Sequence, residues 1–198
     1  MKRCRQCGRP LATENGSSEY VESIRDYSKI DMPKDGNCFY HAFIRGLYEA
    51  QVHPEGTDGQ GWNPSSLTPA VLRDQVARVI EINQDMYNDV LIEWRDFHVI
   101  HRQQGLQGGN VGNPTPFQVA QRIRNTREWA TSTVIHILSV LYNVTIVVYE
   151  EINGYYYAES FPSAWKKVPP RNPIARLTVL RTGNHFDLLV KRKPLVSQ

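Results

Sequence analysis

A cysteine near the front of the chain and a histidine–aspartate pair near its end carry side chains suited to nucleophilic catalysis. Cys38 follows the turn sequence Asp35-Gly36-Asn37, and His185 precedes Asp187 by two positions. A thiolate can attack a carbonyl carbon, an imidazole can take and return its proton, and a carboxylate can orient the imidazole. Each half also has an ordinary interpretation: a buried cysteine at a helix start, and a rim histidine beside a solvated aspartate. The pair suits acyl transfer only if the fold unites the two ends.

The setting of Cys38 favours a reactive thiol. The Asp-Gly-Asn turn delivers the chain into a segment with helical apolar spacing, so a helix is expected to start at or near Cys38. Free N–H groups and the positive end of the helix dipole lie at such a start. We therefore expect a lowered pKa for Cys38. Gly36 should allow the backbone to approach a substrate closely. The N–H groups of the turn and of the helix start should face the oxyanion that forms when the sulfur attacks a carbonyl.

The setting of His185 suggests how the imidazole is oriented. Residues 185–192 have the pattern of a strand, so His185 and Asp187 should point to one face, and Phe186, Leu188 and Val190 to the core. A carboxylate at this spacing can accept the Nδ1–H bond. Nε2 would then be free to take a proton from sulfur.

Helices dominate the first part of the chain and strands the last part. Helices are expected over 38–50, over about 69–83 behind the Thr68-Pro69 start signal, over 85–101, and over 131–142 with Ile135, Leu138 and Leu141 inward. Strands are expected over 144–152, 155–160, 174–181 and 185–192, with turns at 153–154 and 183–184. This order predicts a single α+β domain with a mostly antiparallel sheet.

Two long segments rich in Gly, Pro and Asn, 53–66 and 103–117, read as irregular loops. Residues 1–18 read as a polar, loosely attached lead-in. This lead-in contains Cys4 and Cys7 at the spacing of half a zinc site. Four ligands are needed for structural zinc, so two reduced thiols are favoured, and a zinc shared with another chain stays open.

Composition bounds the class of protein. The chain has 198 residues, 23 Lys+Arg and 20 Asp+Glu, a net charge of +3 that is too small for a protein coating phosphate backbones. Its apolar runs are too short to cross a membrane, and no apolar secretory segment follows Met1. Three cysteines do not form a disulfide framework, so a reducing compartment is expected: the cytoplasm, or a host cytosol for a viral or bacterial protein.

The combination of the two motifs resembles the ovarian-tumour (OTU) family of cysteine proteases, which are mostly deubiquitinases. The segments DGNC and HFD carry the resemblance, at 35–38 and 185–187. Three further segments are similar to the family in order and spacing: 72–77, 128–131 and 141–149. The resemblance covers about residues 30–192. It implies a papain-like OTU domain over 19–198, with helices packed around a small sheet.

The resemblance also implies roles for named residues. Cys38 would be the nucleophile, His185 the general base and acid, and Asp187 the orienting acid, with Asp35 as a secondary candidate for support. The loop Asp35, Gly36, Asn37 and Cys38 would form the oxyanion hole. Trp129 would line the channel for the C-terminal Gly-Gly tail of ubiquitin, or it would pack in the core. Glu128 would pair with arginines of that tail, or it would remain solvated.

Where the family usually has Leu-Phe-Arg after the cysteine, this chain has Phe39-Tyr40-His41. We assign no catalytic role to His41 and expect a packing or surface position.

The implied function is hydrolysis after the C-terminal Gly-Gly of ubiquitin or a ubiquitin-like modifier, through a thioester. No metal or organic cofactor is needed. The implied partner is ubiquitin or polyubiquitin, with no nucleic acid and no membrane, and the protein is expected to be a monomer. Two alternatives stay open: a catalytically silent ubiquitin-binding module on the same fold, and nucleic-acid binding through the basic clusters at 122–127 and 191–193.

Overall fold

The structure, a computed structural model, is α+β, as expected. It describes residues 19–21, 24–51, 66–83, 115–125, 129–152, 155–162 and 172–192. In chain order the elements are β1 (Glu19–Val21), β2 (Tyr27–Ile30), α1 (Cys38–Glu49), α2 (Pro69–Ile82), α4 (Pro116–Asn125), α5 (Ser132–Leu141), β3 (Val144–Ile152), β4 (Tyr155–Phe161), β5 (Ala175–Thr182) and β6 (His185–Lys191).

One sheet with the strand order β1-β4-β3-β5-β6-β2 forms the centre of the fold. Neighbouring strands run antiparallel except β3 and β5, which are parallel. The expected mostly antiparallel sheet is therefore confirmed. In this order β6, which begins at His185, lies between β5 and β2 and is held on both edges.

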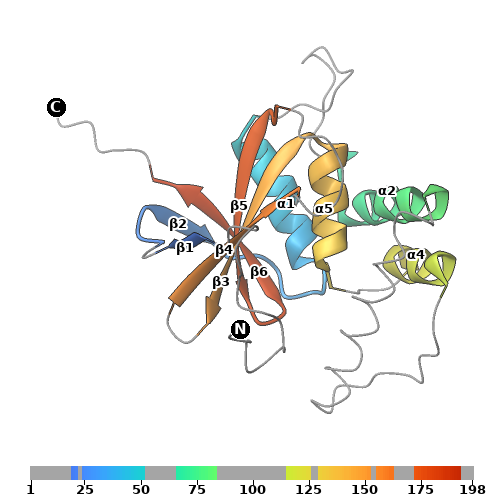
Figure 1. The fold of residues 1–198 in the computed structure, drawn as a ribbon, viewed down its shortest axis with the longest axis horizontal. Helices are drawn as coiled ribbons and strands as arrows, with labels where there is room; N and C mark the ends of the chain where they lie inside the picture. Colours follow the sequence, from blue (N-terminus) through green and yellow to red (C-terminus); the bar gives the residue numbers. More distant parts are fainter. Residues whose placement is uncertain are drawn as a thin grey trace.

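The described helices lie on one face of the sheet (Figure 1). The helix α1 packs on β5 and β6, α5 packs on β3 and β4, and α2 packs against α4 and α5. The main core fills the space between helices and sheet, and a smaller cluster of Val147, Tyr149, Ala158, Leu180 and Leu189 lies on the opposite face. Alternation along the strands produces these two clusters, since successive side chains point to opposite faces.

Local signals in the sequence account for the helix starts. The helix α1 begins at Cys38, as predicted. The side chain of Thr68 accepts a hydrogen bond from the Val71 N–H at the start of α2, and the side chain of Thr131 accepts one from Val134 at the start of α5. Each bond satisfies one of the N–H groups that a helix leaves without an internal partner.

The inward position predicted for Leu141 is wrong, because this side chain is 47% exposed. Ile135 and Leu138 are buried, as predicted. Residues three apart drift by about 60° around a helix of 3.6 residues per turn. Leu141 thus lies about 120° away from Ile135, beyond the edge of the apolar face.

The helix α4 was not predicted, and its first two residues fall in the expected loop 103–117. Its start signal is a capping box: Thr115 Oγ1 accepts from the Gln118 N–H at 3.2 Å, and Gln118 Oε1 accepts from the Thr115 N–H at 2.9 Å. The Thr-Pro pair at 115–116 repeats the pair that starts α2. The short strands β1 and β2 were also missed, since three or four residues give too little alternation to recognise.

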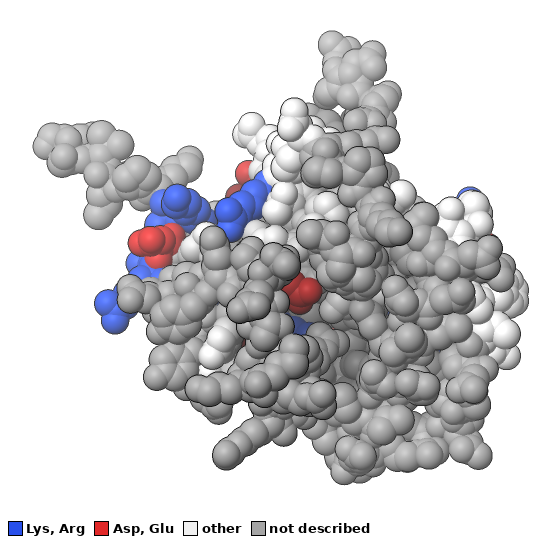
Figure 2. Space-filling view, viewed as in Figure 1, with Lys and Arg blue, Asp and Glu red and all other residues white. Residues whose placement is uncertain are grey.

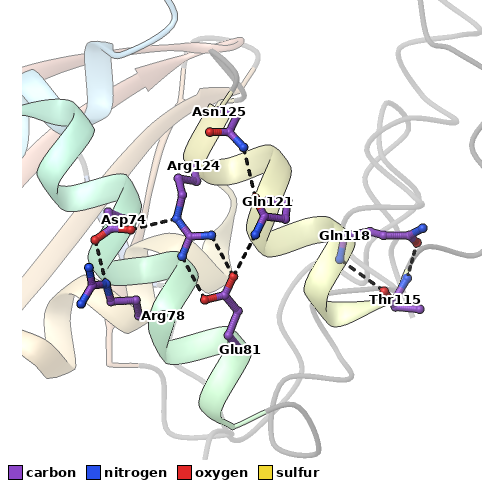
Figure 3. Close-up of polar contacts among 8 residues, drawn as sticks. All are labelled: Asp74, Arg78, Glu81, Thr115, Gln118, Gln121, Arg124 and Asn125. Atoms are coloured by element: carbon purple, nitrogen blue, oxygen red, sulfur yellow. Dashed lines mark hydrogen bonds and ion pairs between the residues drawn. The ribbon is translucent and has the colours of Figure 1, made fainter.

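Ion pairs fasten α4 to α2 (Figure 3). Arg124 on α4 donates to Asp74 at 2.8 Å and to both oxygens of Glu81 at 2.8 and 2.9 Å. Asp74 also pairs with Arg78 at 2.8 Å, and Gln121 donates to Glu81 at 3.3 Å. This two-pronged geometry of Arg124 fixes both the spacing and the register of the two helices.

Some expectations fall outside the described residues: the lead-in 1–18, residues 53–65 of the loop 53–66, the helix 85–101, residues 103–114 of the loop 103–117, and the turn at 153–154. Among the helices that the structure describes, none is long and apolar enough to span a membrane.

Two leucines of α5 test the assignment of its buried face. Leu138→Ala should lower the free energy of unfolding by about 2–5 kcal/mol, because it opens a cavity in the core, whereas Leu141→Ala should cost less than about 1 kcal/mol. Denaturant unfolding followed by circular dichroism measures both. Equal losses would contradict the observed orientation of α5.

Candidate active site

Cys38 lies beside the start of β6, although the two are far apart in the sequence. Its side chain is 4% exposed, and its Sγ lies 3.9 Å from the carbonyl oxygen of Asn184. The backbone N–H of Phe186 also faces the sulfur. The thiol therefore contacts the residues on both sides of His185.

An aromatic contact holds the two segments together. Phe39, next to Cys38, packs edge-on against Phe186, next to His185, with ring centroids 5.3 Å apart. Both rings are almost fully buried. Since these rings follow the two candidate residues directly, their packing fixes how α1 and β6 approach each other.

His185 and Asp187 form a hydrogen-bonded pair, but through a different nitrogen from the one predicted. The imidazole Nε2 lies 2.9 Å from Asp187 Oδ1, so the predicted Nδ1–H bond is wrong for this structure. Residues two apart on a strand are separated by about 6.6 Å, and the distal Nε2 reaches across this separation better than Nδ1. Nδ1 is therefore the ring nitrogen that does not bind Asp187.

Asp187 is built into the protein rather than solvated. Its side chain is 6% exposed, its Oδ1 also accepts from the Met32 N–H at 3.0 Å, and its Oδ2 lies 3.5 Å from Lys29 Nζ. Burial alone would raise the pKa of Asp187. The bonds from Met32 and His185 and the charge of Lys29 outweigh burial and lower the pKa, so the carboxylate is ionised at neutral pH.

The predicted lowering of the Cys38 pKa is wrong for the protein without substrate. Burial raises the pKa of Cys38 above the ordinary value of 9.0, and the charge of Asp35 adds to the increase. The backbone N–H groups of Phe186, Phe39 and Cys38 oppose this effect without cancelling it. The resting side chain is therefore a thiol, whose S–H donates to Asn184.

The turn before Cys38 is tightly organised around Asp35. Asp35 Oδ1 accepts from the Asn37 N–H at 2.8 Å, and Oδ2 contacts His41 Nε2 at 3.1 Å. Burial would raise the pKa of Asp35, but these bonds outweigh it and lower the pKa to about 2. Gly36 adopts a φ of 82°, in the left-handed region that favours glycine.

These contacts bear on the roles expected for the turn. The Asn37 N–H is already used by Asp35, whereas the Cys38 N–H faces the sulfur of Cys38. Both oxygens of Asp35 are directed to Asn37 and His41 rather than toward His185. His41 is half-buried and contacts Asp35 of the turn, which agrees with the expected packing or surface position.

Sequence reasoning also missed Arg73 on α2. Its side chain is 3% exposed, and it donates to the turn before Cys38. Its position in the sequence could have indicated that Arg73 is buried, because it lies on the apolar face of α2 with Val76, Ala77 and Ile80. A charged side chain within such a stripe needs buried hydrogen-bond partners.

The remaining candidates are only partly described. Trp129 is half-buried just before α5, while Glu128, Cys4 and Cys7 lie outside the described residues. Across the described ranges, no group of three or more His, Cys, Asp or Glu side chains is arranged to hold a metal ion.

Comparisons with known proteins agree with the fold. The family model described as OTU-like cysteine protease matches residues 33–167. This range contains Cys38 but ends before His185, so the placement of the histidine rests on the structure. No curated protein sequence matches the chain.

Three solved structures illustrate the structural similarity. An OTU deubiquitinase from Wolbachia pipientis wMel, bound to ubiquitin, has a TM-score of 0.55 at 16% identity, covering 85% of this chain and 98% of that chain. The viral OTU domain protease from Dera Ghazi Khan virus has a TM-score of 0.53 at 16% identity, covering 90% and 89%. An OTU domain in complex with ubiquitin has a TM-score of 0.52 at 18% identity, covering 83% and 69%.

The raised pKa of Cys38 predicts how alkylation of the free protein depends on pH. In a Cys4→Ser, Cys7→Ser background, the iodoacetamide rate at Cys38 should climb by about tenfold per pH unit from pH 7 to pH 9, because the thiolate fraction rises in that proportion below the pKa. Mass spectrometry measures the rate, and Cys38→Ala in the same background is the control. A rate already constant at neutral pH would indicate a preformed thiolate and contradict the resting thiol.

Proposed function

Because the chain belongs to the family of OTU-like cysteine proteases, we propose that it is a deubiquitinase using Cys38, His185 and Asp187. The observation that supports this most is the position of the Cys38 sulfur, between the Asn184 carbonyl and the Phe186 N–H on either side of His185. The buried, ionised Asp187 bonded to the imidazole supports the same assignment.

The first step of the proposed reaction forms a thioester. His185 Nδ1 takes the thiol proton as Cys38 Sγ attacks the carbonyl carbon of the last glycine in the terminal Gly-Gly of ubiquitin. Asp187 accepts from Nε2–H and stabilises the imidazolium. The Cys38 N–H and the start of α1 stabilise the oxyanion. The imidazolium then protonates the leaving amine, and the C–N bond breaks.

The second step regenerates the thiol. The neutral imidazole takes a proton from water as the water oxygen attacks the thioester carbonyl. The imidazolium returns that proton to sulfur as the C–S bond breaks, which releases the C-terminus of ubiquitin as a carboxylic acid. The second proton of the attacking water leaves with this acid and passes to solvent, because a carboxyl group is ionised at neutral pH.

The substrate class follows from the family and its relatives. Two of the compared structures hold ubiquitin, and a Gly-Gly tail requires a channel that excludes side chains. Trp129 is our candidate for a wall of this channel, and Glu128 for pairing with the arginines of the tail. The proposal includes ubiquitin-like modifiers with the same Gly-Gly end as substrates. It also includes two properties of the protein: it is a monomer, and it acts in a reducing compartment.

A catalytically silent ubiquitin-binding module is the second candidate. The observation that favours it is the resting state of Cys38, which is 4% exposed and has a raised pKa. A silent module would bind ubiquitin and cleave no conjugate. The ordered Asp187–His185 pair is a feature that such a module would not need.

The basic clusters give nucleic-acid binding little support. Arg124 from the first cluster is bound by two carboxylates of α2 (Figure 3). Figure 2 shows basic side chains gathered near one edge of the sheet, but with acidic side chains among them. Over the described part of this face, such mixed charge does not make the continuous positive surface that a phosphate backbone requires.

Two substitutions test the nucleophile and the base. Cys38→Ala and His185→Ala should each remove cleavage across a panel of all diubiquitin linkages and ubiquitin-like conjugates, with losses of about 10³-fold or more in kcat. Circular dichroism should show both variants folded. Ubiquitin binding without cleavage by the wild-type protein would favour the silent module, and full activity of Cys38→Ala would refute the proposal.

Asp187 tests whether the imidazole has a second support. Asp187→Ala should lower kcat by about 10²-fold or more, because both oxygens of Asp35 are directed elsewhere. Asp187→Asn should be milder, since its amide oxygen can still accept from Nε2–H. Steady-state kinetics on a ubiquitin substrate measures both. A mild Asp187→Ala effect that Asp35→Ala then worsens would show that Asp35 provides the support after all.

A further inference from the structure

Arg73 connects three parts of the protein around the turn that precedes Cys38. Its Nη2 donates to the Gly36 carbonyl at 3.0 Å, its Nε donates to Asn37 Oδ1 at 2.9 Å, and its Nη1 donates to the Ile123 carbonyl at 3.1 Å. Its guanidinium also lies over the Tyr40 ring, 4.4 Å from the centroid. Burying this cation is costly, so the arrangement persists only because its donors are well matched.

One of these contacts and a hydrogen bond to Asp35 together determine the orientation of one peptide unit. Arg73 holds the carbonyl of the Gly36–Asn37 peptide, while Asp35 Oδ1 holds its N–H at 2.8 Å. Carbonyl and N–H point in opposite directions across a planar trans peptide, so the pair of contacts prevents it from rotating. Rotation is otherwise easy here, because Gly36 tolerates many backbone conformations.

The hydrogen bond from Arg73 Nε to Asn37 Oδ1 keeps the Asn37 side chain away from the N–H groups at the start of α1. Asn37 is the N-cap residue of α1, yet its side chain makes no capping bond to the helix. An N-cap asparagine ordinarily accepts from an N–H group of the first turn. Here its Oδ1 is directed to Arg73, which leaves the first N–H groups of α1 facing the sulfur of Cys38.

We propose that Arg73 is a positioning residue for the oxyanion site, resting on the function proposed above. It fixes the Gly36–Asn37 peptide and diverts the Asn37 side chain, so that the N–H groups at the start of α1 remain available to the developing oxyanion. Arg73 acts through the turn and does not itself touch substrate.

A purely architectural role is the competing explanation, because Arg73 also joins α2 to α4 through Ile123. Arg124 provides a matched control. It is an arginine that fastens the same two helices, but it donates to Asp74 and Glu81 rather than to the turn (Figure 3). If packing of α2 on α4 is all that matters, Arg124→Met and Arg73→Met should have the same effect on catalysis.

The experiment compares wild type, Arg73→Met, Arg73→Lys and Arg124→Met in the full chain. Three quantities are measured: kcat and KM on a fluorogenic ubiquitin amide, inhibition by ubiquitin aldehyde, and hydrogen exchange of the peptide covering residues 35–41. The aldehyde forms a tetrahedral adduct whose oxygen occupies the oxyanion site. Hydrogen exchange reports the turn directly and needs no ubiquitin.

Arg73→Met should lower kcat by about 10²–10³-fold with KM within about threefold of wild type. It should also weaken aldehyde inhibition and speed exchange in residues 35–41. Arg73→Lys should lower kcat by about tenfold, because an ammonium cannot reproduce the fork of three bonds. Arg124→Met should lower thermal stability while leaving kcat and exchange of the turn near wild type.

The inference is overturned if folded Arg73→Met keeps wild-type kcat and exchange, or if Arg124→Met reproduces its loss of kcat. If Arg73→Met does not fold, Arg73→Lys decides the matter by the same criteria. The two proposals fail separately: an inactive wild type removes the proposed function, while faster exchange confined to the Arg73 variants still supports the positioning of the turn.

Discussion

The packing of Phe39 against Phe186 is the contact on which the candidate site depends. These rings stand directly beside Cys38 and His185, and both are buried between α1 and the sheet. Their burial is favoured by the hydrophobic effect and by edge-to-face geometry, and neither contribution involves the reactive groups. Apolar packing thus positions the polar side chains of the candidate site. The strand β6 is held between β5 and β2, and α1 packs on it.

Asp187 and Asp35, the two ionised aspartates of the site, differ in what they bind. Asp187 is buried, bonded to His185 and held ionised, so it is ready to stabilise an imidazolium. Asp35 is also ionised, but its bonds organise the turn and its charge raises the pKa of the thiol. The resting side chain of Cys38 is therefore a thiol, and in the proposed mechanism its proton moves to His185 as the sulfur attacks the substrate carbonyl. The two carboxylates differ in role because their hydrogen-bond partners differ: Asp187 binds His185, and Asp35 binds Asn37 and His41.

Much of this arrangement could be predicted from the sequence, for identifiable reasons. The Asp35-Gly36-Asn37 turn predicted the start of α1, and the Thr68-Pro69 pair predicted the start of α2. Alternation along β6 placed His185 and Asp187 on one face. The helix α4 carried its own capping box and was missed because Gly and Asn fill the stretch before it.

Other features depend on tertiary distances and could not be read from spacing. The choice of Nε2 rather than Nδ1 depends on the span between His185 and Asp187, and the raised pKa of Cys38 depends on burial by neighbouring elements. The partners of Arg73 lie 36 to 50 residues away along the chain, beyond the reach of local pattern.

The most direct test of the central claim is to map the adduct formed with ubiquitin bearing a C-terminal propargylamide. Such a probe reacts with a cysteine only when binding and an adjacent base bring the thiol into reaction. The account predicts one adduct, located at Cys38 by peptide mass spectrometry, unchanged by Cys4→Ser or Cys7→Ser and strongly slowed by His185→Ala. No adduct, or an adduct at Cys4 or Cys7 instead, would contradict it.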